Sequence, residues 1–165
     1  MNFAETLEKL EASKEFRNFK KKNTDAYLCA GFFVIDFEAG KDTQQMDFQC
    51  DEQIAAFSVS DRIEMKMEET IDKKKVPEIK KEIKIDLDEM QKIAGKEIEK
   101  SKISTKLNKM IAILQMNNEK QIWNITCIFA SLAMLRVHID AFSGDVLRAD
   151  KSSLFDFVQK GGKNS

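Results

Sequence analysis

The chain has 165 residues, a length that suits one domain of ordinary size. Hydrophobic residues make up 42% and charged residues 33%, which excludes general disorder because a sizeable core can form. The 27 Lys and Arg residues nearly balance the 28 Asp and Glu residues, which argues against a generally basic nucleic-acid binder and against a strongly acidic mimic.

The first part of the chain has the pattern of a helix followed by strands. Apolar spacing predicts a helix over residues 2–22, and its phase shifts at Ser13, which can cap a second short helix. The aromatic run 27–37 predicts a central strand that is buried on both faces. Alternating apolar and polar residues predict three further strands, at 46–50, 57–59 and 63–68.

The second part repeats this order. Asp86, with Glu89 three residues later, has the spacing of a capping box and predicts the start of a helix. We expect this helix to extend through Ile103 and Leu107, and we expect residues 83–85 to form a short edge strand. Four strands and a final short helix are predicted at 110–115, 121–129, 135–141, 146–149 and 154–160.

Helices set apart from strands that are joined by hairpins predict an α+β fold, in which antiparallel sheet cradles the helices. We expect one compact domain over residues 1–160, built of two α+β halves, 1–69 and 83–160. The charged connection 70–82 holds the only proline and is expected to be mobile, and 161–165 is expected to be a flexible tail.

The two halves also contain strands of similar sequence. Residues 44–50 and 121–127 both begin with Gln and end with Cys, and polar residues separate their apolar ones. Alternation alone makes many strands look alike, so both a true duplication and a chance likeness stay open.

The cysteines and the apolar runs bear on the compartment. Cys29, Cys50 and Cys127 lie far apart among apolar neighbours and lack zinc-ligand spacing, so we expect buried thiols in a reducing cytoplasm. The first residues lack the positive start and apolar run of a secretory signal, and no apolar run is long enough to span a membrane. We therefore expect a cytoplasmic protein without a metal or other cofactor.

The single histidine is the candidate for catalytic chemistry. On a strand, Arg136, His138 and Asp140 fall on one face, so Asp140 can orient His138 as a base. The plainer interpretation, which we favour, is a polar strand face with an Arg and an Asp around a histidine. No serine or cysteine stands in a recognisable nucleophile motif beside it.

Lysine clusters are the candidate for nucleic-acid binding. They are Lys20, Lys21, Lys22, Lys73, Lys74, Lys75, Lys80 and Lys81. Such clusters can contact phosphates, but acidic residues dilute the later ones, so solvated helix ends and loops are the favoured interpretation.

The last third of the chain carries three short motifs. They are Ile122-Trp123-Asn124, Leu135-Arg136-Val137-His138-Ile139-Asp140-Ala141 and Ser143-Gly144-Asp145-Val146-Leu147. This series resembles the end of a PepSY-type module, a cystatin-like unit with a helix against a curved antiparallel sheet. The resemblance implies a non-catalytic interaction module.

These observations predict a small cytoplasmic, non-enzymatic binding module. Its partner is expected to be a protein or a second copy, bound at a sheet edge or at the concave face of the sheet. The alternatives are an enzyme that uses His138 and Asp140 in a cleft, and a nucleic-acid or ribosome-associated factor that uses the lysine clusters.

Overall fold

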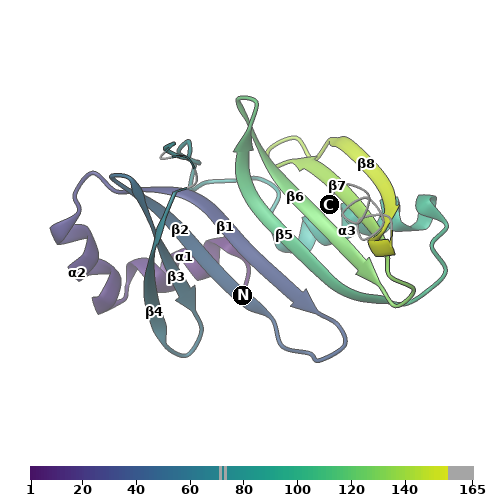
Figure 1. The fold of residues 1–165 in the computed structure, drawn as a ribbon, viewed down its shortest axis with the longest axis horizontal. Coiled ribbons are helices and arrows are strands. Elements are labelled where there is room, and N and C mark those ends of the chain that lie inside the picture. The colour runs from purple at the N-terminus through teal and green to yellow at the C-terminus, as the bar shows by residue number, and fades with distance from the viewer. Residues whose placement is uncertain (71, 73, 156–165) are drawn as a thin grey trace, which may run out of the picture.

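A computed structural model describes residues 1–70, 72 and 74–155 of the chain. Its helices and strands come in the order α1–α2–β1–β2–β3–β4–α3–β5–β6–β7–β8 (Figure 1). The helices are α1 (Phe3–Glu11), α2 (Lys14–Lys22) and α3 (Leu87–Ser101). The strands are β1 (Tyr27–Asp36), β2 (Thr43–Cys50), β3 (Gln53–Val59), β4 (Ile63–Glu69), β5 (Leu107–Asn117), β6 (Lys120–Phe129), β7 (Ala133–Asp140) and β8 (Val146–Ser153).

All eight strands belong to one antiparallel sheet with the order β4-β3-β2-β1-β5-β6-β7-β8. Sequence neighbours pair throughout, except in the centre, where β1 pairs with β5 from Gly31↔Leu114 to Asp36↔Lys109. The helix-then-four-strands order therefore occurs twice, and the two sets of strands fan out in opposite directions from the β1·β5 seam. The α+β class with antiparallel sheet is confirmed.

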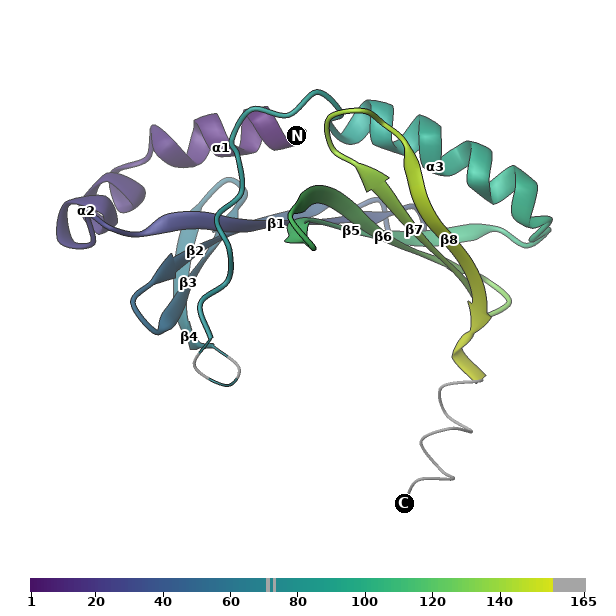
Figure 2. The same cartoon turned by 90° about the horizontal axis from the view of Figure 1, so that it is seen from above.

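The helices lie on one face of the sheet and enclose the core with it (Figure 2). Phe3 of α1 packs edge-on against Phe33 of β1, with ring centroids 6.4 Å apart, and Phe33 in turn meets Trp123 of β6 at 5.7 Å. Phe16 and Phe19 of α2 likewise pack against Phe48 of β2 and Phe57 of β3, with ring centroids 5.0–6.3 Å apart. The core is thus one layer of apolar side chains between helices and sheet.

Both halves begin with a capped helix, and one carboxylate joins the two caps. Asn2 caps α1 by accepting from the Glu5 amide, and Asp86 caps α3. The Asp86 carboxylate also accepts from the amides of Phe3 and Ala4, at 2.8 and 3.1 Å. It therefore satisfies free N–H groups at the start of both helices.

The connection between β4 and α3 is bonded to the strands at several of its described residues, while the mobility of the linker over 70–82 stays a prediction. The amide of Val76 donates to Gln49 Oε1 at 2.9 Å, and Tyr27 Oη donates to the Val76 carbonyl at 2.7 Å. Ile79 is buried, and the backbone N–H and C=O of Lys80 both bond to the Gln121 side chain. Buried polar side chains of the strands thus fasten this segment.

Several predicted boundaries differ from the structure. The helix over 2–22 breaks into α1 and α2, and Ser13 caps the second by accepting from Phe16 N, as its sequence position predicted. Residues 83–85 form no strand, because the amides of Lys84 and Ile85 both donate to the carbonyl of Ala141, at the end of β7.

Near the later elements, sequence and structure differ in two further places. α3 ends at Ser101 because Lys102 adopts a left-handed backbone with φ of 60°, and Leu107 begins β5 instead. Of the predicted helix over 154–160, only Leu154 and Phe155 lie among the described residues, and both are helical. The remainder of that helix and the predicted tail at 161–165 lie outside them.

Candidate functional site

The face of the sheet opposite α1, α2 and α3, which we call the helix-free face, is concave. Figure 2 shows the whole sheet arching away from α1 and α3, and Figure 1 looks onto its hollow side. Because strand residues alternate between faces, the residues between core positions point to this side. In β5, for example, Met110, Ala112 and Leu114 belong to the core, so Ile111 and Ile113 lie on the helix-free face.

Apolar side chains cover the middle of this face. Phe32 of β1 is paired with Ile113 of β5, and Val34 is paired with Ile111. These four side chains are half-buried, and α1, α2 and α3 all lie on the other side of the sheet (Figure 2). Apolar residues of β1, β5 and β6 on this face, with Asn124 and Thr126 among them, form a set that we call the central band: Ala30, Phe32, Val34, Ile111, Ile113, Ile122, Asn124, Thr126 and Ile128.

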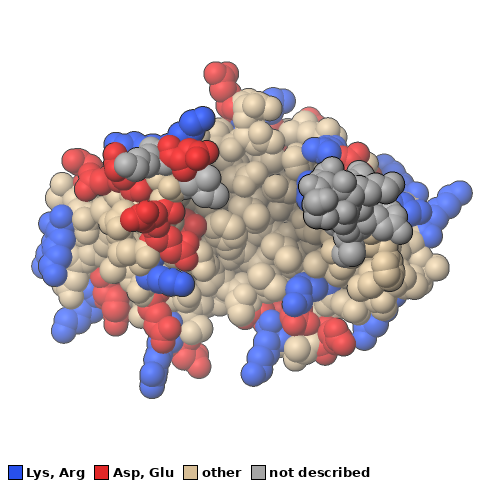
Figure 3. Space-filling view, in the orientation of Figure 1, with Lys and Arg blue, Asp and Glu red and all other residues tan. Residues whose placement is uncertain are grey.

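Charged residues flank the central band on both sides. In Figure 3 an uncharged zone runs through the middle of the face, between zones in which acidic and basic residues are mixed. On the β4 side the charges include Glu64, Lys66 and Glu68, and on the β7–β8 side they include Arg136 and Arg148. A contiguous apolar zone with a polar rim is typical of a binding surface.

Beside the band, β2 carries a buried carboxylate on the same face. Asp47 is only 9% exposed and lies between Ala30 of β1 and Ala56 of β3, which are its cross-strand neighbours. Gln45 Nε2 donates to its Oδ1 at 2.8 Å. Burial, reinforced by the nearby Glu68 charge, raises the pKa of Asp47 to about 6.

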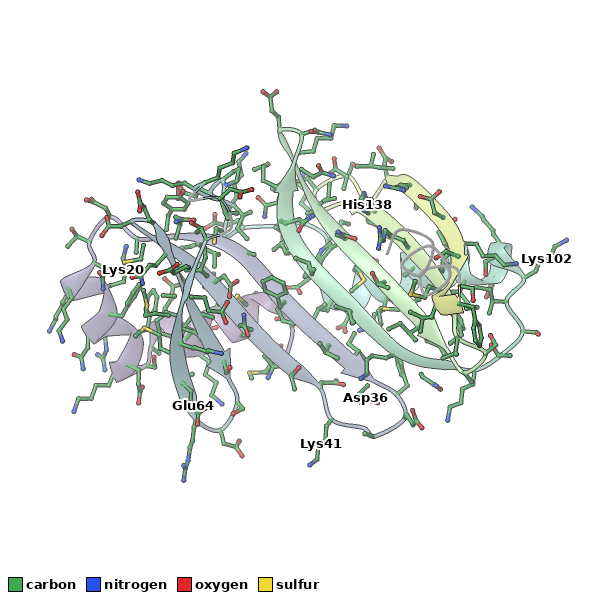
Figure 4. The ribbon with its side chains drawn as sticks, in the orientation of Figure 1. Lys20, Asp36, Lys41, Glu64, Lys102 and His138 are labelled. Atoms are coloured by element: carbon green, nitrogen blue, oxygen red, sulfur yellow. The ribbon has the colours of Figure 1, made fainter. Side chains whose placement is uncertain are left out.

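His138 lies at the edge of the central band on β7 (Figure 4), paired with Asn124 on one side and Arg148 on the other. Its Nε2 is buried and has no hydrogen-bond partner in the described part of the chain. Burial, together with the charges of Arg148 and Arg136, lowers the pKa of His138, so the ring is neutral at pH 7.

Asp140 does not orient His138. Its Oδ1 accepts from the amides of Phe142 and Ser143, at 2.8 and 3.0 Å, so its carboxylate shapes the turn after β7. These hydrogen bonds lower the pKa of Asp140. The structure thus places both residues on one face, as alternation predicted, but does not assemble them into a base and its orienting partner.

The candidate lysines do not gather on one surface. Lys20 on α2 donates to the carbonyls of Thr24 and Ala26, and Lys81 pairs with Glu11 at 2.9 Å. The ammonium of Lys80 lies 5.4 Å from the centre of the Phe142 ring. The basic groups Lys21–Lys22 and Lys74–Lys75 lie on α2 and on the connection after β4, respectively, and Lys73 lies outside the described residues.

All three cysteines are free and buried, as the sequence predicted. Burial raises the pKa of Cys29 and of Cys127 to about 12, so neither is a thiolate at neutral pH. The described residues hold no group of three or more His, Cys, Asp or Glu side chains placed to bind a metal ion. Among them, no helix is long and apolar enough to cross a membrane.

The sequence patterns missed the two features that mark this face. The run 27–37 predicts a strand that is buried on both faces, whereas Phe32 and Val34 are half-exposed on the helix-free face. Asp47 stands in a regular alternation and looks like an ordinary solvent-facing residue. One sequence signal could have revealed the apolar face. The predicted central strands carry apolar residues at both odd and even positions, but the predicted helices are enough to cover only one face of the sheet.

No family model matches the chain, and no curated protein sequence matches it. The crystal structure of a "putative lipoprotein" from Clostridium difficile 630 is similar, with a TM-score of 0.59 and 14% sequence identity. The match covers 84% of this chain and 90% of that one. At such low identity the likeness concerns the fold alone, and the resemblance to PepSY-type modules stays a prediction. The chain therefore has an α+β fold on an antiparallel sheet, which it shares with a protein described as a lipoprotein.

Proposed function

We propose that this chain is a non-enzymatic binding module, and that the central band is where it binds a segment of another protein. The observation that carries this proposal is the row of half-buried apolar side chains on β1 and β5, on the side of the sheet away from α1, α2 and α3. Leaving such side chains in contact with water forgoes about 25 cal/mol of stability for each Å² of apolar surface. A partner that covers them recovers this free energy on binding.

The shape of the face favours another protein over a second copy. The sheet arches, so two copies placed face to face would meet at their rims and leave their central bands apart (Figure 2). A convex occupant, such as an amphipathic helix of a partner, can reach the band at its centre. Its apolar side chains would meet Phe32 and Ile113, and its polar side chains would meet the charged flanks.

Site-specific photo-crosslinking in the native cell tests the proposal. A photoreactive phenylalanine analogue replaces Phe32 in the band or, as a matched control, Phe37, which is 43% exposed just beyond the end of β1. We expect a discrete adduct with one other protein from position 32 and none from position 37. A second change, Ile113→Lys, should abolish that adduct because it places a charge in the middle of the band.

A further variant shows that the loss comes from the band and not from unfolding. Met65→Lys makes the same kind of change at an exposed strand position outside the band, and the adduct should survive it. Denaturant midpoints establish that both lysine variants are folded. Equal crosslinking from positions 32 and 37, no adduct at all, or an adduct of twice the chain's own mass would each overturn the proposal.

Two finer features belong to the same proposal. We propose that each half is a cystatin-like unit, supported by the repeated order of helix and four antiparallel strands. We also propose a cytoplasmic location, supported by three free, buried thiols. Fractionation of the native cell checks the location, and recovery of the chain in the membrane fraction would contradict it.

A further inference from the structure

Beside the central band, the helix-free face has a recess at Asp47 that contains charged groups. Both cross-strand neighbours of Asp47 are alanines, which have short side chains. A depression of about 460 Å³ lies there, lined by β2, β3, β4 and the connection that follows β4. Asp47 forms part of its lining, and Oδ2 accepts no hydrogen bond in the described part of the chain, whereas Oδ1 is bound to Gln45.

The walls of this recess combine apolar surface with negative charge. Ile54 of β3 and the side chains of Val76 and Pro77 supply the apolar surface, and Glu68 of β4 adds a second carboxylate. The Val76 wall is fixed, because Gln49 and Tyr27 hold both its N–H and its C=O. The wall of the recess at Val76 is therefore held in position by buried or half-buried side chains of β1 and β2.

Among the described residues, the lysines beside the recess form no ion pair with its carboxylates. Lys74 and Lys75 also line the recess, but neither comes within 4.0 Å of a carboxylate oxygen of Asp47 or Glu68 in the described residues. A carboxylate that is nine-tenths buried without a cationic partner destabilises the fold. A bound cation would offset this cost by supplying the positive charge that the carboxylate lacks, so a carboxylate in such a place is a candidate binding group.

We propose that this recess binds the cationic side chain, arginine or lysine, of the protein segment that lies along the central band. The inference rests on the proposed function and adds to it the chemistry of the partner. Ala30 borders both the band and Asp47, so a segment that covers the band brings its neighbouring side chain over the recess. The aliphatic stem would pack on Ile54 and Pro77, while the charged end meets Asp47 and Glu68.

The test uses capped amino acids as probes, so it does not require the partner. The full-length ¹⁵N-labelled chain is titrated with N-acetyl-arginine amide, N-acetyl-lysine amide, or the neutral isostere N-acetyl-citrulline amide. We expect saturable shifts with at least one cationic probe, centred on the amides of Ala30, Asp47, Ala56 and Val76. The dissociation constant should be in the millimolar range, and citrulline should bind at least tenfold more weakly.

Two variants decide the role of Asp47. Asp47→Asn keeps the size of the side chain and the acceptor for Gln45, and it should weaken binding of the cationic probe at least tenfold. Asp61→Asn removes an exposed carboxylate in the β3–β4 turn and should leave binding unchanged. Equal binding of arginine and citrulline, or cationic binding that survives Asp47→Asn, would overturn the inference. Crosslinking from position 32 does not depend on these probes. Loss of cationic binding with crosslinking retained would therefore contradict only the recess, whereas loss of crosslinking would contradict the binding role of the central band.

Discussion

Asp47 is a buried carboxylate that lowers the stability of the folded chain when it is ionised. Its carboxylate lies between two alanines of the neighbouring strands, and it accepts only one side-chain hydrogen bond, from Gln45. Burial raises its pKa to about 6, so the folded chain holds this proton more tightly than the unfolded chain does. A group of this kind makes folding less favourable once it is ionised.

This shift predicts the pH dependence of stability. With the folded pKa near 6 and the unfolded pKa near 3.9, the penalty is absent below about pH 4, grows between pH 4 and pH 6, and is then constant. Asp47→Asn should therefore raise the free energy of unfolding at pH 8 by about 1–3 kcal/mol and flatten this part of the pH profile. Denaturant midpoints at pH 4.5 and pH 8 measure it. An unchanged difference between the two pH values would contradict the assignment.

Trp123 is the residue whose truncation should cost most. The indole is fully buried between β6 and the helices, packs on Phe33, and donates from Nε1 to the Ile85 carbonyl at 2.7 Å. Trp123→Ala should lower the free energy of unfolding by about 3–5 kcal/mol. His138→Gln, at the half-buried rim of the opposite face, should cost less than about 1 kcal/mol. Urea midpoints compare the two variants, and a stable Trp123→Ala protein would refute this position of the core.

At the scale of elements, the residue that caps the start of α3 also binds the start of α1, and we call this shared cap the Asp86 clamp. Asp86 accepts hydrogen bonds from three backbone amides, those of Phe3, Ala4 and Leu87. Asp86→Ala would leave these donors without their acceptor at both helix starts. We expect a loss of about 2–3 kcal/mol, more than a single N-cap contributes.

Two companion variants separate the clamp from a general charge effect. Asp88→Ala, an exposed acidic residue in the first turn of α3, should change stability by less than about 0.5 kcal/mol. Asp86→Asn keeps one carbonyl acceptor and should fall between the two. Thermal or urea unfolding followed by circular dichroism measures all three, and equal losses at Asp86 and Asp88 would rule out the shared cap.

Local patterns in the sequence were enough to identify most strands and the helix starts. The alternation in 63–68 and the spacing of Asp86 and Glu89 each reflect a single element, so they can be interpreted without knowing its neighbours. The β1·β5 pairing was not predicted, because it joins residues as far apart as Gly31 and Leu114. The band and the Asp47 recess depend on that pairing and on the side from which the helices pack, so no local pattern contains them.

At the scale of the whole molecule, cleavage of the connection after β4 can test how firmly the two halves are joined. Asp72, Lys74 and Lys75 are exposed, whereas Ile79 is buried and Lys80 is bonded to Gln121 through its backbone. Limited trypsin digestion should therefore cut after Lys74 or Lys75 well before Lys80 or Lys81.

The two fragments should stay together after this cut. The β1·β5 ladder, the Asp86 clamp and the contact between Phe33 and Trp123 all cross from one half to the other. Size-exclusion chromatography of the nicked protein should give one peak at the size of the intact chain, and the fragments should separate only in denaturant. Two separate, folded fragments in native buffer would show instead that each half is a domain.

The strand order also sets how the chain reaches its folded state. Six of the seven ladders join strands that follow one another in sequence, and only the β1·β5 ladder closes a loop of about eighty residues. Hairpins form in microseconds, so this single closure is the slow step that topology imposes. Substitutions that weaken the seam should slow refolding, whereas equal losses at β4 or β8 should appear as faster unfolding. The most central strands of the finished sheet are thus the last to meet.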